Sequence, residues 1–181
     1  MKTIASVTAV LLMSIGVLAQ ARPDAVPGKA AVRHESTITL AVAGLACNTP
    51  VGGGAFHILS WSWGATNTTT QNTGSGAGAG KASITGLNVT KRFDECSPAL
   101  FKGVATGQIF ETVTLTQQDS NGNVVTTLTL TNAIVSAWQI GGDINDEIPS
   151  ESVSFNFTKI CISDIASGTT VCYDSSLDKV N

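Results

Sequence analysis

The chain has 181 residues and few charges, with 10 Lys and Arg against 13 Asp and Glu and a formal net charge of −3. Charged residues make up 13% of the sequence, and no basic patch with interleaved aromatic side chains occurs, which argues against a nucleic-acid partner. The surface must instead be covered by Thr, Ser, Asn and Gly, as is common in exported β proteins and in surfaces that pack against copies of themselves.

The first 21 residues have the pattern of a secretory signal peptide. Lys2 gives a positive start, residues 4–18 form an apolar run, and Ala19-Gln20-Ala21 is a small-x-small cleavage pattern, so we expect cleavage after Ala21. The run is shorter than the roughly 20 apolar residues that a membrane span needs, and no stable membrane insertion is expected. The mature chain, Arg22–Asn181, would carry nine basic and thirteen acidic side chains and be exported, periplasmic or extracellular.

Beyond the signal, residues 22–35 carry two prolines and no apolar periodicity, so they are predicted to be a flexible leader. Residues 36–181 are predicted to be a single β-rich domain. Asn121-Gly122 is a strong signal for a hairpin, and the change of apolar phase after Phe157 predicts a bulge or a change of face near Thr158. Alternation and β-branched content predict strands over 37–42, 57–63, 82–90, 111–117, 126–131, 133–140 and 152–158.

One short helix is predicted in the stretch CSPALFKGVATG. Ser97 is a good N-cap and Pro98 suits the first helical position. The apolar stripe of this helix would be Leu100, Phe101 and Val104, with Gly103 and Gly107 limiting its length. Together these elements predict a mainly β fold, a small antiparallel barrel or two packed sheets, with one short flanking helix.

Four cysteines in a chain bound for an oxidising compartment predict two disulfides, for which three pairings are possible. Cys161 and Cys172 flank a strand-turn-strand pattern whose turn falls near residues 166–168, so folding the hairpin would place them opposite one another. Cys47 with Cys96 then follows by elimination. A zinc site is the alternative, but no CxxC spacing occurs and the two histidines are far apart.

The stretch WSWGATNTTTQNTGSGAGAGKAS, residues 61–83, raises the question of a phosphate-binding loop. Gly80-Lys81 is present, but Ser75 stands where the first glycine of a Walker A loop belongs, and Ala82 follows the lysine. A dinucleotide fingerprint over 74–79 would need a strand-to-helix turn, whereas another strand follows here. The stretch is therefore interpreted as an architectural loop, with no cofactor.

Catalytic and metal-binding patterns are weak. His34 falls in the leader, His57 is interpreted as a partly buried strand histidine, and no GxSxG elbow occurs. The acidic stretch over 143–147 lacks the glycine and the distal glutamate of an EF-hand loop, so it is interpreted as a surface loop. Catalytic, cofactor-binding and metal-binding residues are accordingly all predicted as none.

The three tryptophans are the last candidate functional residues in the sequence. Trp61 and Trp63 lie two apart on one predicted strand and so face the same side. Core packing is the favoured interpretation for these two and for Trp138. The alternatives are a stacking platform for a sugar or an aromatic patch between subunits.

Several of these pieces resemble one known family. A strand ending in Trp61-Ser62-Trp63-Gly64 precedes a long Gly/Ser/Thr loop, and the block T-K-x-x-D-x-x-S-P-x-L begins at Thr90. A glycine hairpin and the stretch ESVSFNF, residues 151–157, follow. From about Thr37 onward the chain resembles the Hcp (haemolysin-coregulated protein) family, the tube protein of type VI secretion. The positions that carry the resemblance are Trp61, Trp63, Lys91, Asp94, Ser97, Pro98 and Leu100.

The resemblance implies a β-barrel with one flanking helix that forms a ring of six, stacked into a hollow tube that is expelled with effectors. It also implies that residues 65–80 make ring-to-ring contacts, for which small residues suit close backbone approach. The residues assigned to this assembly loop are Gly64, Thr69, Gly74, Gly76, Gly78, Gly80 and Lys81. The export signal, the four cysteines and a shortened final hairpin depart from the family pattern.

The sequence therefore predicts an exported, disulfide-bearing, Hcp-like structural protein without catalytic activity. Its partners would be copies of itself, with effector cargo or secretion-apparatus proteins as further partners. The alternative from another class is a secreted β-sandwich that binds a carbohydrate or another surface ligand through Trp61, Trp63 or Trp138.

Overall fold

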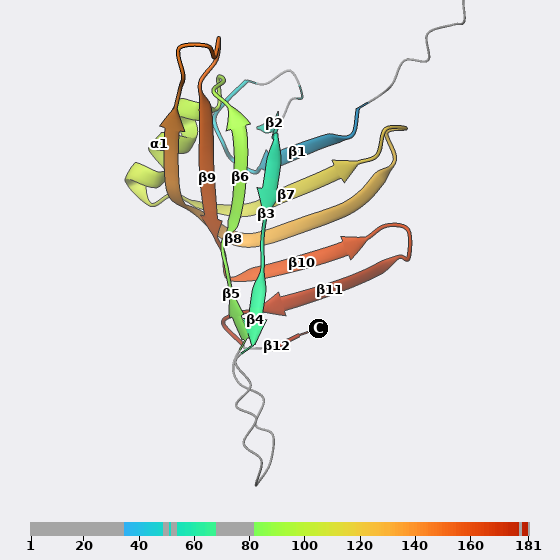
Figure 1. The fold of residues 1–181 in the computed structure, drawn as a ribbon. Coiled ribbons are helices and arrows are strands. Elements are labelled where there is room, and N and C mark those ends of the chain that lie inside the picture. The colour runs from blue at the N-terminus through green and yellow to red at the C-terminus, as the bar shows by residue number, and fades with distance from the viewer. Residues whose placement is uncertain (1–34, 49–50, 52–53, 68–81, 178, 181) are drawn as a thin grey trace, which may run out of the picture. The chain divides into compact units, whose positions relative to one another are not determined.

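The computed structural model describes residues 35–48, 51, 54–67, 82–177 and 179–180. Nearly all of the predicted leader, and the whole predicted signal peptide, fall outside these residues. The described part is mainly β with one helix, α1 (Ser97–Thr106) (Figure 1). The strands are β1 (Thr37–Val42), β2 (Ala55–His57), β3 (Ser60–Ser62), β4 (Ala65–Asn67), β5 (Ala82–Ile84), β6 (Leu87–Arg92), β7 (Ile109–Gln118), β8 (Val124–Gly141), β9 (Ser150–Asn156), β10 (Lys159–Asp164), β11 (Thr169–Asp174) and β12 (Lys179–Val180).

The long strand β8 organises the fold because it belongs to two half-sheets (Figure 1). Strand β7 pairs with residues 124–134 of β8, β10 pairs with residues 126–131, and β9 pairs with residues 134–141. The strand bends where the partner changes: Asn132 has a φ of 49°, and the register with β9 shifts between Val135 and Ala137. The two strands predicted over 126–131 and 133–140 are therefore one bent strand.

Two half-sheets result, with antiparallel neighbours throughout the described residues. The first has the order β12-β11-β10-β8-β7-β1-β2, and the second has the order β8-β9-β6-β3. The predicted change of face near Thr158 is confirmed, because β9 ends at Asn156 and β10 starts at Lys159 against the other half of β8. Because of this break, β9 belongs to one half-sheet and β10, which follows it directly, belongs to the other.

Of the two arrangements predicted, the described residues form two packed half-sheets and not a closed barrel. The strand predicted over 57–63 is broken into β2 and β3, and each piece pairs with a different half-sheet. At the break, the Ile58 amide donates to the Ile38 carbonyl at 3.0 Å, while the Leu59 amide donates to the Thr90 carbonyl at 2.7 Å. Single hydrogen bonds, rather than a continuous ladder, therefore join the half-sheets on this side.

The core lies between the half-sheets and follows from period-2 alternation. In the first half-sheet, Leu40, Leu115 and Leu128 lie in one row across β1, β7 and β8 and are at most 1% exposed. The facing strands contribute Leu87, Val89, Val153 and Phe155. Burying each such side chain contributes about 1.5–3 kcal/mol, which fixes the registers because a one-residue slip would expose a whole face.

Helix α1 packs against β8. Gly103 is buried in the middle of the helix, against the Phe110 ring. A glycine suits this position because a Cβ would lie 3.3 Å from that ring. Gly107 ends the helix in the left-handed conformation, with φ 64°, and its amide bonds the Gly103 carbonyl. The predicted apolar stripe is only partly correct, since Leu100 is buried but Phe101 is 53% exposed.

The predicted hairpin at Asn121-Gly122 joins β7 to β8 through residues 119–123. The Asp119 carboxylate accepts hydrogen bonds from the amides of Asn121 and Asn123 and from the Asn123 side chain, and these lower the pKa of Asp119. A separate two-stranded sheet, β4 with β5, brackets residues 68–81. None of the described helical residues forms a helix long and apolar enough to cross a membrane.

Candidate functional site

Two disulfides join the four cysteines. Cys161 and Cys172 are direct partners across β10 and β11, as the hairpin geometry predicts. Cys47 bonds Cys96, which is fully buried at the start of α1, so this bridge ties the segment after β1 to the helix. The structure therefore contains the favoured pairing.

A buried lysine at the end of β6 is the centre of the site. Leu87, Val89 and Lys91 occupy alternate positions that face inward on β6, so Lys91 is carried into the core with 0% exposure. Its direct partner across the ladder is Glu151 on β9, which occupies the inward position of that strand and is 1% exposed. The fold thus places two opposite charges face to face inside the protein.

The Lys91 ammonium is surrounded by acceptors. Its Nζ lies 2.8 Å from Glu151 Oε1 and 2.7 Å from Asp94 Oδ1. It also donates to the Arg92 carbonyl at 2.8 Å and to Ser97 Oγ at 3.2 Å. A lysine has three N–H donors, so these acceptors account for all of them. We call Lys91, Asp94, Ser97 and Glu151 the lysine network.

The lysine network also fixes the start of α1. The Asp94 amide donates to Ser97 Oγ at 2.9 Å, and the Cys96 amide donates to Asp94 Oδ1 at 2.8 Å. Ser97 is therefore not the N-cap: Cys96 holds that position without a side-chain cap, and Pro98 is the second helical residue. The Ser97 hydroxyl, buried beside Lys91, bonds that lysine instead of capping the helix.

Aromatic side chains close the network on two sides. Trp138 Nε1 donates to Glu151 Oε2 at 3.1 Å, and its ring packs at 5.3 Å from the ring of Phe101 on α1. The Phe56 ring lies 5.1 Å from Lys91 Nζ, within the range of a cation–π contact. Both Glu151 oxygens are therefore bonded, and strand, helix and core are held together at one point.

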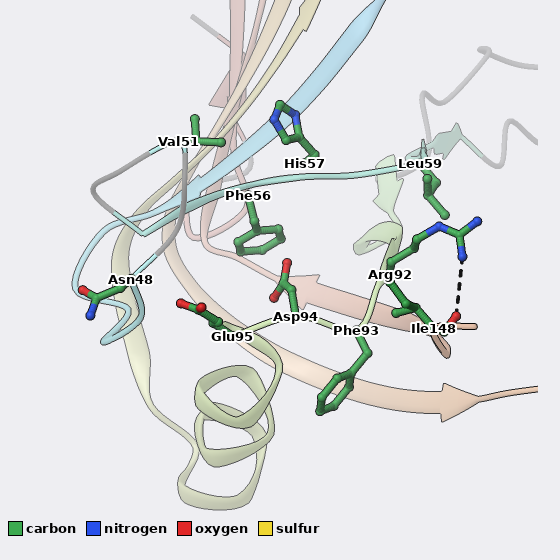
Figure 2. A pocket seen from close by; sticks show the side chains of 10 residues that line it. All are labelled: Asn48, Val51, Phe56, His57, Leu59, Arg92, Phe93, Asp94, Glu95 and Ile148. Carbon is green, nitrogen blue, oxygen red and sulfur yellow. Dashed lines mark hydrogen bonds between the residues drawn. The ribbon is translucent and has the colours of Figure 1, made fainter. Parts of the chain in front are cut away.

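A pocket of about 430 Å³ opens beside this network (Figure 2). Phe56 and Asp94 point toward each other from its walls, so Asp94 links the pocket to the buried lysine (Figure 2). Arg92 reaches the Ile148 carbonyl at 3.5 Å across one side. The lining is largely apolar with a charged rim, and comprises Asn48, Val51, Phe56, His57, Leu59, Arg92, Phe93, Asp94, Glu95 and Ile148.

The interpretation of His57 is only partly correct, whereas residues 143–147 form an exposed loop as predicted. His57 lies on strand β2 as predicted, but it is exposed rather than partly buried, because it occupies the outward position next to Phe56. It lines the pocket. In the loop, Asp143 accepts hydrogen bonds from the amide and side chain of Asn145, which lower the pKa of Asp143. Across the residues that the structure describes, no three His, Cys, Asp or Glu residues gather as metal ligands.

The tryptophans pack inward. Trp61 on β3 and Trp63 just after it both contact the core, and Trp61 Nε1 donates to Gln117 Oε1 at 3.1 Å. Trp138 is also partly buried against the core. The two half-sheets therefore use all three rings as packing material, with the indole N–H groups of Trp61 and Trp138 bonded to side chains of the fold.

Of the predicted assembly loop, only Gly64 is described. Its amide donates to Thr85 Oγ1 at 2.9 Å, and its carbonyl accepts from the Thr85 amide at 2.9 Å, which ties the two chain ends together at the base of β4 and β5. Thr69, Gly74, Gly76, Gly78, Gly80 and Lys81 lie outside the described residues.

The sequence patterns identify three residues of the lysine network but do not predict the contacts between its members. The sequence identifies Lys91 and Asp94 only as family positions and Ser97 as a family position and an N-cap. It does not connect Glu151, Trp138 and Phe56 with them. A signal was present: Glu151 has the same parity as Val153 and Phe155, and Lys91 has the same parity as Val89. Two opposite charges on inward-facing positions of separate strands indicate a buried ion pair.

The structure is a β protein in which buried polar groups join separate secondary-structure elements. The family of the type VI secretion system effector Hcp matches residues 51–163, more than half of the sequence, and the chain belongs to this family. Hcp proteins are structural components of type VI secretion.

Solved structures agree with this assignment. Hcp1 from Salmonella typhimurium is 26% identical with a TM-score of 0.69, and the match covers 81% of this chain and 99% of that one. Hcp2 from the same organism (21% identity, TM-score 0.59, covering 78% and 98%) shows the same fold. So does a type VI secretion system effector from Yersinia pestis (19%, 0.62, 76% and 98%). Comparison with curated protein sequences finds no significant match.

Proposed function

We propose that the mature chain assembles with copies of itself into a ring of six, and that rings stack into a tube. The observation that carries this proposal is the coverage of 99% of Salmonella Hcp1, because it means that the chain contains nearly the whole of an Hcp unit. Identical subunits that meet head to tail close into a ring when the rotation between neighbours permits it. Ring formation would also shelter the free edges of β2 and β3.

The predicted signal peptide and the two disulfides support assembly outside the cytoplasm. Disulfides persist in oxidising compartments, and all four cysteines of this chain are paired. We propose that the chain is exported, that cleavage after Ala21 releases a chain beginning at Arg22, and that rings form in the periplasm or beyond. Mass spectrometry of the exported protein tests the cleavage site directly.

The loop between β4 and β5 is proposed to make the ring-to-ring contact. The hydrogen bonds between Gly64 and Thr85, together with the pairing of β4 and β5, join the two chain segments that flank residues 68–81. Its glycines would let backbones of neighbouring rings approach closely. Stacking would then depend on this loop, whereas ring closure would not.

The role proposed here is structural rather than catalytic. The lysine network supports this, because each acceptor around Lys91 Nζ belongs to the fold and the group is buried. The packing of the three tryptophans against the core gives no support to the alternative of a sugar-stacking platform. A His57→Ala variant is expected to assemble like the wild type, since His57 lies on the exposed rim of the pocket.

The test is the mass of the chain Arg22–Asn181, folded under oxidising conditions, by light scattering after size exclusion, with negative-stain images of the same peak. The matched variant deletes residues 69–80, so that a tight turn joins β4 to β5. We expect the mass of six protomers and annular particles for both chains, and stacked tubes only for the wild type.

A monomer at high concentration under these conditions would overturn the ring. Tubes formed by the deletion variant would overturn the role of the loop while leaving the ring intact. Circular dichroism of both chains ensures that a loss of assembly is not a loss of fold.

A further inference from the structure

The Cys47–Cys96 disulfide joins two chain segments that each contribute a residue to the pocket lining. Asn48 on one wall directly follows Cys47, and Glu95 on the other directly precedes Cys96. A covalent bond therefore joins the chain segments at the point where both enter the pocket lining. The Cys161–Cys172 bridge has no sequence neighbour in the lining of this pocket, because it links neighbouring strands of one hairpin.

The segment after β1, residues 43–48, is weakly attached apart from this bond. The Leu45 amide bonds the Val42 carbonyl, and the Cys47 amide bonds the Leu45 carbonyl, so both hydrogen bonds are local. Ala43 bonds the Thr112 carbonyl at the start of the segment, and Leu45 is buried, whereas Gly44, Ala46 and Asn48 are exposed. The disulfide is thus the main tie at the distal end of the segment.

The far side of the bridge is independently anchored. Cys96 donates its amide to Asp94 Oδ1, and Asp94 is held by Lys91. Helix α1 and the network it starts from would therefore remain in place without the disulfide. Breaking the bond should release one wall of the pocket and leave the other wall unchanged.

We propose that Cys47–Cys96 is a reducible latch: oxidised, it fixes residues 43–48 against the start of α1 and completes the pocket; reduced, it frees this segment while the two half-sheets stay folded. The pocket and the apolar side chains around it would then take their final arrangement only in an oxidising compartment. This regulation goes beyond the proposed assembly and does not depend on it.

The two cysteine residues differ in exposure, and this difference sets which sulfur an external thiolate attacks. Cys47 is partly exposed, whereas Cys96 is 0% exposed. An external thiolate therefore attacks Cys47 Sγ, and Cys96 leaves as the thiolate at the N-terminal end of α1, where the helix dipole favours negative charge. The product is a mixed disulfide on Cys47, and Cys96 takes up a proton.

A second thiol then completes the reduction. It attacks the sulfur of the reductant in the mixed disulfide, so Cys47 leaves, takes up a proton, and the reductant becomes a disulfide. Two electrons and two protons have passed from two small thiols to the bridge. Oxidation is the reverse, with a small-molecule disulfide such as oxidised glutathione as the electron acceptor.

The first experiment measures hydrogen exchange by mass spectrometry on the mature chain with Cys47→Ser and Cys96→Ser. The matched control carries Cys161→Ser and Cys172→Ser, which removes the bridge that has no relation to the pocket. We expect amides of residues 43–48 to exchange at least about tenfold faster in the first variant and at the wild-type rate in the control. Amides of β7 and β8 should keep their protection in the first variant.

Two results would overturn the latch. Unchanged exchange over 43–48 would mean that packing alone holds the segment. Loss of protection throughout the sheet, with loss of the far-ultraviolet dichroism signal, would make the bridge a staple of the whole fold.

A second experiment uses the wild type and needs no variant to fold. The oxidised protein is treated briefly with reduced glutathione, free thiols are blocked by acid quench and alkylation, and the peptides are mapped. We expect the glutathione adduct on Cys47 and the alkylated thiol on Cys96. An adduct predominantly on Cys96, or no adduct on either residue under conditions that reduce Cys161–Cys172, would contradict the proposal.

Discussion

Replacement of Lys91 by methionine tests the view that the lysine network holds the fold together. Methionine keeps the length of the side chain but removes the charge, and leaves Glu151, which is 1% exposed, with Trp138 as its remaining side-chain donor. Stranding one member of a buried ion pair costs about 3–5 kcal/mol. For a domain of this size, that loss corresponds to a fall in melting temperature of about 6–20 °C.

The structure predicts an asymmetry between the two partners. In a Glu151→Gln variant, Lys91 keeps Asp94 at 2.7 Å, so the charge stays paired and the cost should be only about 1.5–3 kcal/mol. The double replacement Lys91→Met with Glu151→Leu should cost less than Lys91→Met alone, because no buried charge is left unpaired.

The assay is urea unfolding with both disulfides intact, followed by far-ultraviolet dichroism. Lys102→Met is the matched control, because Lys102 is an exposed lysine on α1 and its replacement should change the free energy of unfolding by no more than about 0.5 kcal/mol. The reasoning would be refuted if Lys91→Met were as mild as Lys102→Met. It would also fail if Glu151→Gln were more destabilising than Lys91→Met.

Three further predictions concern the helix, a turn and the hairpin disulfide. Gly103→Val should lower the free energy of unfolding by about 1–3 kcal/mol, since even a Cβ meets a buried ring at 3.3 Å; unchanged urea midpoints would show that the helix can move away. The pKa of Asp119 is lowered from 3.8, mainly by the Asn123 side chain, so its contribution to stability is present above that value and lost as the pH falls through the lowered pKa. Nuclear magnetic resonance titration should therefore find a higher pKa for Asp119 in Asn123→Ala, and an equal pKa would contradict the assignment. Replacing both Cys161 and Cys172 by alanine should cost about 3 kcal/mol in urea unfolding, given the sequence separation of 11, and a loss below about 1 kcal/mol would contradict this chain-entropy estimate.

Local features were predictable because their cause is local. Alternation of apolar and polar residues placed β1 at Thr37–Val42, and the Asn121-Gly122 pair placed the turn between β7 and β8. The Cys161–Cys172 pairing also follows from one hairpin. Each of these features depends on residues close together in the sequence.

The predicted bounds of strands and helix were wrong where partners distant in the sequence determine them. Periodicity indicated two strands over 126–140, but β8 continues through Asn132 because neighbours on both half-sheets pair with it. The strand over 57–63 is broken because Ile58 and Leu59 bond different half-sheets. Ser97 has the chemistry of an N-cap, yet its hydroxyl lies beside a buried lysine.

The sequence by itself determined the β class, the one helix, the hairpins and the inward parity of Lys91 and Glu151, because each depends on residue type and spacing along a few residues. Only the tertiary structure decided that these two charges meet, since they are 60 residues apart and the register of β6 on β9 places them opposite one another. The same holds for the pocket, whose walls come from separate elements joined by Cys47 and Cys96. Packing between half-sheets selects one register among many, and no short stretch of sequence contains that information.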